Sequence, residues 1–143
     1  MTLTARRPRP SSSRSRTARL LAGLEIATGV AAVVGGGLLV AAPDGHLMQA
    51  DAAVLAGSPF TDWRLPGVLL ATLVGGGYLL AGAWQLRNGP LARELSMAAG
   101  AGLVVFELAE LAWIGFQPLE AVFAAVGATV LVLAVRQPRR ETS

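Results

Sequence analysis

The sequence predicts an all-α membrane protein in which four transmembrane helices form a bundle. Hydrophobic residues make up 53% of the 143 residues and charged residues only 15%, whereas about 25% of a soluble domain is charged. Four apolar stretches have the length of roughly 17–25 residues that a helix needs to cross a bilayer. The expected spans are about 20–42, 66–86, 95–116 and 119–135. Together they predict one transmembrane domain over residues 19–136.

The distribution of arginine predicts how the bundle is oriented. Of the 12 basic residues, all arginine, six precede the first span, two lie between the second and third spans and three follow the fourth. Only Arg64 lies on the other side. Since arginine-rich flanks stay in the cytoplasm, both termini are expected on the cytoplasmic side of a bacterial inner (plasma) membrane. Residues 1–18, rich in arginine, proline and serine, are expected to form a disordered tail, and 137–143 a second cytoplasmic tail.

The composition also excludes several classes of site. The chain has no cysteine, which excludes disulfides, thiolate nucleophiles and thiolate metal sites. The single His46 and the carboxylates Asp44, Asp51 and Asp62 lack the spacing of metal ligands, so neither a metal nor a cofactor is expected. A net charge of +3 would suit nucleic acid, but the arginines flank the spans and no nucleic-acid partner is expected. The expected partners are membrane lipid and a second copy or another membrane protein.

Glycines in the spans predict close helix contacts. VVGGGLLVAA at 33–42 and LVGGGYLLAG at 73–82 repeat a triple glycine at an offset of 40 residues. Small residues let helix backbones approach closely in lipid, although a hinge or a ligand groove at these glycines is an alternative. The residues expected at helix contacts are Gly29, Gly36, Gly75, Gly76 and Gly100.

The connection over 43–65 is too long to lack structure of its own. Asp44 can cap a short extracytoplasmic helix over 46–56, which Gly57 and Pro59 would end. Phe60 is expected at the membrane interface and Pro66 in the first turn of the second span. We treat the following residues as a loop motif: Gly57, Ser58, Pro59, Phe60, Arg64, Pro66 and Gly67.

The third span carries two acids, Glu107 about 18 Å and Glu110 about 22 Å from its start. An acidic group near the bilayer centre costs roughly 2.5–3.5 kcal/mol, so this helix needs neighbours that accommodate the carboxyls. With no basic residue inside any span, at least one of the two is expected to be neutral at pH 7. One side of this span, expected to face the bundle, carries Ser96, Gly100, Leu103, Glu107, Glu110 and Gln117.

Three functions remain open for a buried polar set of Glu25, Tyr78, Glu107, Glu110 and Gln117. The first, which we expect, is a structural or accessory subunit in which Tyr78 or Gln117 hydrogen-bonds the protonated glutamates and fixes the helix register. The second is a small transporter subunit that uses Glu107 and Glu110 for protons or cations. The third is a redox accessory protein that binds a quinone or lipid. Glu25 is expected to be a packed or snorkelling carboxyl. The acids have no nucleophile or base beside them, so no enzyme is expected.

Short motifs resemble a group of small four-span membrane proteins common in actinobacteria. They are GSPF at 57–60, Pro66-Gly67 at the start of the second span, and Trp113-Ile114 followed by Gln117 at the end of the third. The resemblance covers about 20–135 and implies an integral membrane protein without implying an activity. In span count and size the chain also resembles four-helix DoxX-type proteins, which are associated with redox-linked membrane complexes.

Overall fold

In the computed structural model, which describes residues 12–138, every regular element is helical. The elements are α1 (Ser12–Ala41), η1 (His46–Met48), η2 (Ala52–Leu55), α2 (Arg64–Leu69), η3 (Leu70–Gly76), α3 (Gly77–Leu86), α4 (Ala92–Ile114) and α5 (Pro118–Arg136). Here η1 and η2 are 3₁₀ turns and η3 is a π-helical segment that joins α2 to α3. The stretches long and apolar enough to cross a membrane are Arg16–Ala41, Arg64–Leu86, Ala92–Ile114 and Pro118–Arg136. The predicted all-α class with four candidate spans is therefore confirmed.

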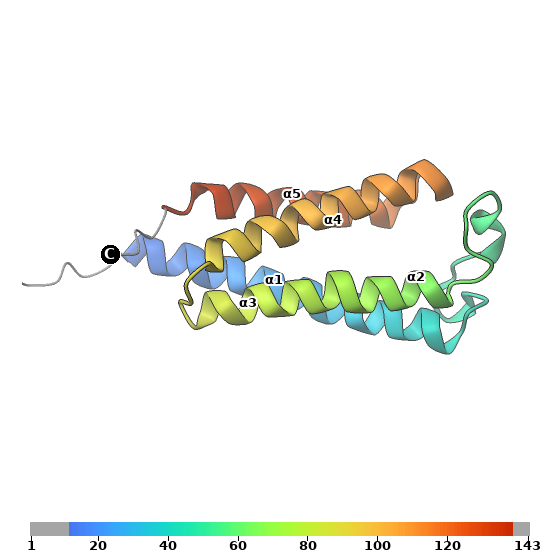
Figure 1. Cartoon of the computed structure of the whole chain (residues 1–143), viewed down its shortest axis with the longest axis horizontal. Helices are drawn as coiled ribbons and strands as arrows, with labels where there is room; N and C mark the ends of the chain where they lie inside the picture. Colours follow the sequence, from blue (N-terminus) through green and yellow to red (C-terminus); the bar gives the residue numbers. More distant parts are fainter. Residues whose placement is uncertain (1–11, 139–143) are drawn as a thin grey trace, which may run out of the picture.

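The four spans form two antiparallel hairpins (Figure 1). α1 packs along α2, η3 and α3, while α4 packs along α5. The hairpins touch mainly through α3 and α4, with a smaller contact between α1 and α5. They lie close together at the end that carries the 87–91 turn, here named the turn end, and diverge at the end that carries the 42–63 loop, the loop end.

Glycine pairs allow the close approach within each hairpin. A Cβ on Gly29 would lie 2.9 Å from the Leu79 backbone nitrogen, and one on Gly75 would lie 3.1 Å from the Val33 nitrogen. Gly36 packs in the same way against Gly67, and Gly100 against Gly127 in the other hairpin. Backbones this close leave no room for a side chain.

Gly76 was predicted at a helix contact, and that prediction is wrong. A Cβ there would meet no described atom within 4 Å. Gly76 is exposed and lies on the side of the second span that faces away from α1. Gly67 and Gly127, which the packing analysis of the sequence did not include, make such contacts instead.

The ends of two helices differ from the sequence prediction. α1 begins at Ser12, so residues 12–18 are helical rather than disordered, because extending an existing helix needs no new nucleation. The rest of the predicted tail, residues 1–11, lies outside the described residues, as do 139–143. α4 ends at Ile114 because Gly115 takes a positive φ of 81°, which terminates the helix.

The first loop does not contain the predicted single helix over 46–56. Gln49 takes a left-handed conformation after the first 3₁₀ turn, and Asp51 is extended. Asp51 Oδ1 accepts a hydrogen bond of 2.8 Å from the Ala53 N–H, which starts a new turn in competition with helix continuation. Leu55 and Trp63 then pack with Leu39 of α1 and with Ile114 at the end of α4. The loop thereby contacts both hairpins where they diverge.

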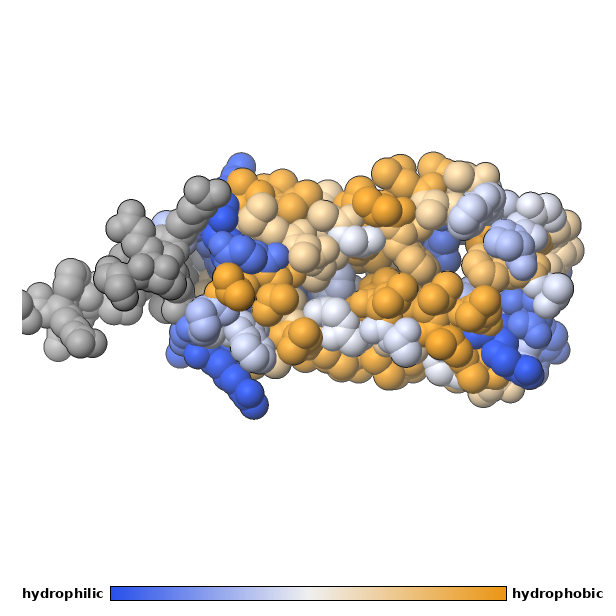
Figure 2. All heavy atoms as spheres, in the orientation of Figure 1, coloured by the Kyte–Doolittle hydropathy of each residue, from blue (hydrophilic) through white to orange (hydrophobic). Residues whose placement is uncertain are grey.

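The surface of the bundle carries a broad apolar belt. In Figure 2 hydrophobic side chains cover the middle of the visible face, and hydrophilic ones gather toward its two ends. Leu73 and Val105 are both 65% exposed, and many other large aliphatic side chains are exposed with them. An apolar surface this extended is typical of a protein that lies in lipid.

Candidate functional site

Three polar side chains from three different spans are buried in the bundle. Glu25 of α1 is 0% exposed, Tyr78 of α3 is 1% exposed and Glu107 of α4 is 5% exposed. The Tyr78 hydroxyl interacts electrostatically with both carboxyl groups. We name these three residues the acid–phenol site. It joins the two hairpins, since Glu25 and Tyr78 belong to one and Glu107 to the other.

Most polar atoms of this site have no direct partner. Within residues 16–138 no hydrogen bond reaches either carboxyl oxygen of Glu25, the hydroxyl of Tyr78, or Oε2 of Glu107. The predicted hydrogen bond between Tyr78 and a glutamate of the third span is therefore not formed. A buried polar group left unpaired costs about 1–3 kcal/mol, and more if it is charged. Groups of this kind in a native fold call for a functional or solvent-related explanation.

Glu25 was expected to be packed or snorkelling, and the structure has it packed. A snorkelling carboxyl would reach the membrane surface, whereas this one is fully buried. α1 packs so closely on α3 that Glu25 Cβ lies 3.3 Å from where a Cβ on Gly82 would be. Its carboxyl is directed into the bundle, where it interacts with the Ser96 hydroxyl of α4 without completing a hydrogen bond.

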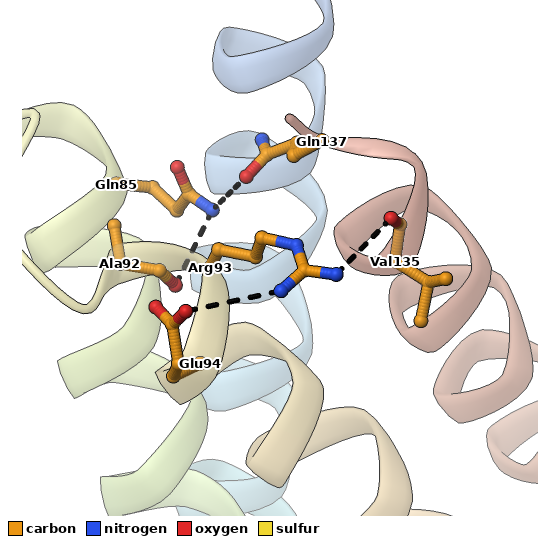
Figure 3. A network of polar contacts seen from close by, with 6 residues as sticks. All are labelled: Gln85, Ala92, Arg93, Glu94, Val135 and Gln137. Atoms are coloured by element: carbon orange, nitrogen blue, oxygen red, sulfur yellow. Dashed lines mark hydrogen bonds and ion pairs between the residues drawn. The ribbon is translucent and has the colours of Figure 1, made fainter. Parts of the chain in front are cut away.

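A hydrogen-bond network closes the turn end next to Glu25. Gln85 Nε2 donates to Ser96 Oγ at 3.0 Å and to Gln137 Oε1 at 3.1 Å, with a longer contact of 3.5 Å to the Ala92 carbonyl. Figure 3 shows Gln85 of α3 joined in this way to the end of α5. Arg93 adds a second tie between α4 and α5, because its Nη2 donates to the Val135 carbonyl at 3.3 Å.

Acidic side chains continue from Glu107 toward the loop end. Glu107 interacts electrostatically with Glu110 and with Glu120, and Glu110 interacts with Glu120. Glu110 is half-buried. Glu120 lies in the first turn of α5, where its Oε2 accepts a hydrogen bond of 3.1 Å from the Gln117 N–H. The acids therefore lie one after another from the middle of the bundle to its loop end.

Gln117 was predicted in the buried polar stripe of the third span, and that prediction is wrong. Ser96, Gly100, Leu103 and Glu107 are buried as expected, but Gln117 is exposed. Because Gly115 ends α4, the helical periodicity that would place Gln117 on the same side no longer applies. Gln117 instead caps the start of α5.

The π-helical segment η3 directly precedes Gly77 and Tyr78. Such segments inside α-helices occur frequently at functional sites. Thr72 Oγ1 donates to the Val68 carbonyl at 2.7 Å, a type of bond that bends helices. The sequence analysis missed this element, although the triple glycine at 75–77 suggested a hinge as one alternative.

The loop motif has a structural role in this fold. Ser58 Oγ accepts a hydrogen bond of 3.2 Å from the Phe60 N–H, and Phe60 packs against the cluster around Leu55. Gly57 adopts a φ of 92°, Pro59 and Arg64 are exposed, and Pro66 and Gly67 are buried. No group of three or more metal-binding side chains occurs in the described part of the chain.

A groove of about 440 Å³ lies between α1 and α5. It is lined by Leu24, Ala121, Val122, Ala125, Val126 and Thr129. Thr129 supplies the one polar side chain of this lining, and its hydroxyl already donates to the Ala125 carbonyl at 2.7 Å. The groove therefore suits a lipid acyl chain better than a quinone headgroup, which needs polar groups to orient it.

No protein-family model, no curated protein and no solved structure matches this chain. The resemblance to actinobacterial four-span proteins stays a prediction, and the function has to be argued from the site itself.

Proposed function

We propose that this protein is a multi-pass protein of the bacterial inner membrane that carries protons or small inorganic cations through its helix bundle. The site of binding is the acid–phenol site formed by Glu25, Tyr78 and Glu107. One observation carries the proposal: two carboxyl groups and a phenol are buried between the hairpins with most of their oxygens unpartnered. Acidic side chains in such positions commonly mark ion pathways and proton relays.

The same observation weighs against the structural role favoured by the sequence. A carboxyl that only fixes the packing of helices is expected to be satisfied by hydrogen bonds, because an unpaired buried group is destabilising. Among the residues described, Glu25 has no ion pair and no complete hydrogen bond, although it interacts with the Ser96 hydroxyl. A proton or cation that binds and leaves would account for keeping these oxygens available.

The positions of the arginines indicate which end of the bundle faces the cytoplasm and which faces the extracytoplasmic side. The turn end carries Arg87, Arg93 and Arg136, which supports a cytoplasmic position for this end and for both termini. The loop end, where Arg64 is the only arginine among the residues described, would then face the extracytoplasmic side. The path to the cytoplasm would pass the Gln85 network, and the path outward would pass Glu110 and Glu120.

The test is ion flux into liposomes that contain the purified protein. Wild-type protein should move protons, or a radioactive cation such as ²²Na⁺ or ⁸⁶Rb⁺, faster than empty liposomes. Glu25→Gln and Glu107→Gln should abolish that flux while helicity and thermal stability persist. The amide has the shape of the protonated acid, but it can neither release a proton nor carry the negative charge that holds a cation. Glu94→Gln, on the exposed start of α4, is the matched control and should behave as wild type.

Two results together would contradict the proposed transport of ions. If wild-type protein moves none of these ions, and infrared difference spectra of its carboxyl groups do not change with pH, the acids are sealed from water. The accessory role then replaces the transport role, and the search turns to partner membrane proteins.

A further inference from the structure

We propose that the transported ion is the proton and that polar side chains from all four spans form a relay for it across the bundle. This inference rests on the proposed function and adds the identity of the ion, the route, and three residues outside the acid–phenol site. From the loop end to the turn end, the relay consists of Glu120, Glu110, Glu107, Tyr78, Glu25 and Ser96.

The order of these residues follows from their places on the helices. Along α4, Ser96 and Glu107 lie about 16 Å apart, and Glu110 lies about 4.5 Å beyond Glu107. Ser96 interacts with Glu25, which places the Glu25 carboxyl toward the turn end. The Tyr78 hydroxyl interacts with Glu25 on one side and Glu107 on the other. Tyr78 therefore bridges the long interval between the two buried acids.

The spacing favours a proton over a metal cation. A hard cation such as Ca²⁺ takes six to eight oxygen ligands at about 2.3–2.6 Å around one point. The acids here are spread along the bundle, and the part of the chain that the structure describes holds no cluster of three metal-binding residues. A proton needs only one acceptor at a time, and chains of carboxyl groups are typical of proton relays in membranes.

Protons and electrons are accounted for at each step of the relay. A protonated carboxyl gives its proton to the next acceptor and becomes a carboxylate that can receive another. Tyr78 gives its hydroxyl proton to one neighbour as it accepts a proton from the other side, so the phenol is unchanged and no electron is transferred. Because the carboxyl of Glu25, the hydroxyl of Tyr78 and Oε2 of Glu107 lack direct hydrogen bonds, the transfers among these three residues require water between them, the usual bridge between buried polar groups.

Ser96 and Gln85 form the exit at the turn end. The Ser96 hydroxyl lies between Glu25 and Gln85, since it interacts with the first and accepts a hydrogen bond from the second. Gln85 is only 4% exposed, and its amide also holds Gln137. A proton that leaves Glu25 must therefore pass through this network to reach water at the turn end.

The experiment compares proton uptake and cation uptake in the same liposomes. Liposomes loaded with the pH dye pyranine are given a K⁺ diffusion potential with valinomycin, and ²²Na⁺ uptake is measured in parallel. Wild-type protein should take up protons and no ²²Na⁺. Tyr78→Phe removes the bridging hydroxyl alone and should lower proton flux by on the order of tenfold or more. Thr129→Val, which removes an exposed hydroxyl that bonds the Ala125 carbonyl of its own helix, should leave the flux unchanged.

Ser96→Ala provides a second variant at the other end of the relay and should also lower the flux. The possible failures separate the two proposals. Proton flux that is undiminished in both Tyr78→Phe and Ser96→Ala overturns the relay but leaves the proposed function intact. Uptake of ²²Na⁺ without proton flux overturns the proton assignment and the relay but leaves the proposed function intact. Absence of both fluxes in wild-type protein overturns the relay together with the proposed function.

Discussion

The hydroxyl of Tyr78 and the carboxyl of Glu25 interact electrostatically across the contact between α3 and α1, yet neither makes a hydrogen bond within residues 16–138. Each side chain is almost completely buried. Buried polar groups without a direct partner in the protein lower the stability of a fold. The proposed exchange of protons would account for both groups, and it has consequences for stability as well as for flux.

Tyr78→Phe is expected to impair proton flux with little change in stability. The hydroxyl has no direct hydrogen bond to the protein among the residues described, so its removal should change the free energy of unfolding by no more than about 1 kcal/mol. Reversible unfolding in mixed micelles measures this change. Thr28→Val is the control, because the Thr28 hydroxyl does have a direct partner, the Leu24 carbonyl at 2.8 Å, and its removal should lower the free energy of unfolding by about 1 kcal/mol. A larger loss in Tyr78→Phe than in Thr28→Val would mean that the Tyr78 hydroxyl has a direct partner in the protein.

Gly29→Ala is expected to destabilise the first hairpin. The new Cβ would lie 2.8 Å from the Leu79 side chain and 2.9 Å from its backbone nitrogen, so the helices must separate, at a cost of about 1–3 kcal/mol. Gly37→Ala is the matched control in the same helix, because its Cβ would meet no described atom within 4 Å. That control should be neutral or stabilising by up to about 1 kcal/mol. Thermal unfolding in detergent distinguishes the two, and equal melting temperatures would contradict the packing.

Gln85→Leu is expected to loosen the turn end. It removes the donor that joins Ser96 and Gln137, and leaves buried acceptors unpaired at a cost of about 1–3 kcal/mol. Hydrogen exchange of the amides over residues 130–137 should accelerate, while exchange in the loop end should not change. Gln49→Leu, at an exposed loop position, is the control. Unchanged protection at the end of α5 in Gln85→Leu would show that this network does not hold the hairpins together.

Asp44 and His46 form a pH-dependent pair in the exposed loop. The hydrogen bond of 2.6 Å between His46 Nδ1 and Asp44 Oδ1 is the main cause that lowers the pKa of Asp44 from its ordinary value of 3.8. A lowered pKa means that the pair supports the loop above pH of about 4. That support is lost as the pH falls through the lowered pKa of Asp44.

His46→Ala is expected to return the pKa of Asp44 toward 3.8, as followed by carboxyl ¹³C NMR. Leu47→Ala changes the neighbouring residue but keeps the pair, and should leave the titration of Asp44 as in wild type. An identical Asp44 titration in wild type and His46→Ala would exclude the pair in solution.

Several features of this protein are encoded locally and were predictable. A helix crosses a membrane because some twenty consecutive residues are apolar, which is a property of each stretch by itself, and all four candidate spans were found in this way. The glycines at 29, 36, 75 and 100 were identifiable because small residues on one helix face allow close packing. Glu107 stood out because an acid in an apolar stretch is expensive.

The composition of the candidate site was decided only by the tertiary structure. Which face of α1 meets α3 depends on the fit of glycines from both helices, and this fit turns Glu25 inward to meet Tyr78 and Ser96. Glu120 lies in the first turn of α5, and it joins the acids only because α5 folds back along α4. Gln117 is not part of the buried polar stripe of α4, because Gly115, with its positive φ, ends that helix before Gln117. Hydropathy and periodicity describe one helix at a time, whereas a site between helices depends on how their faces pack together, and that is determined by the whole bundle.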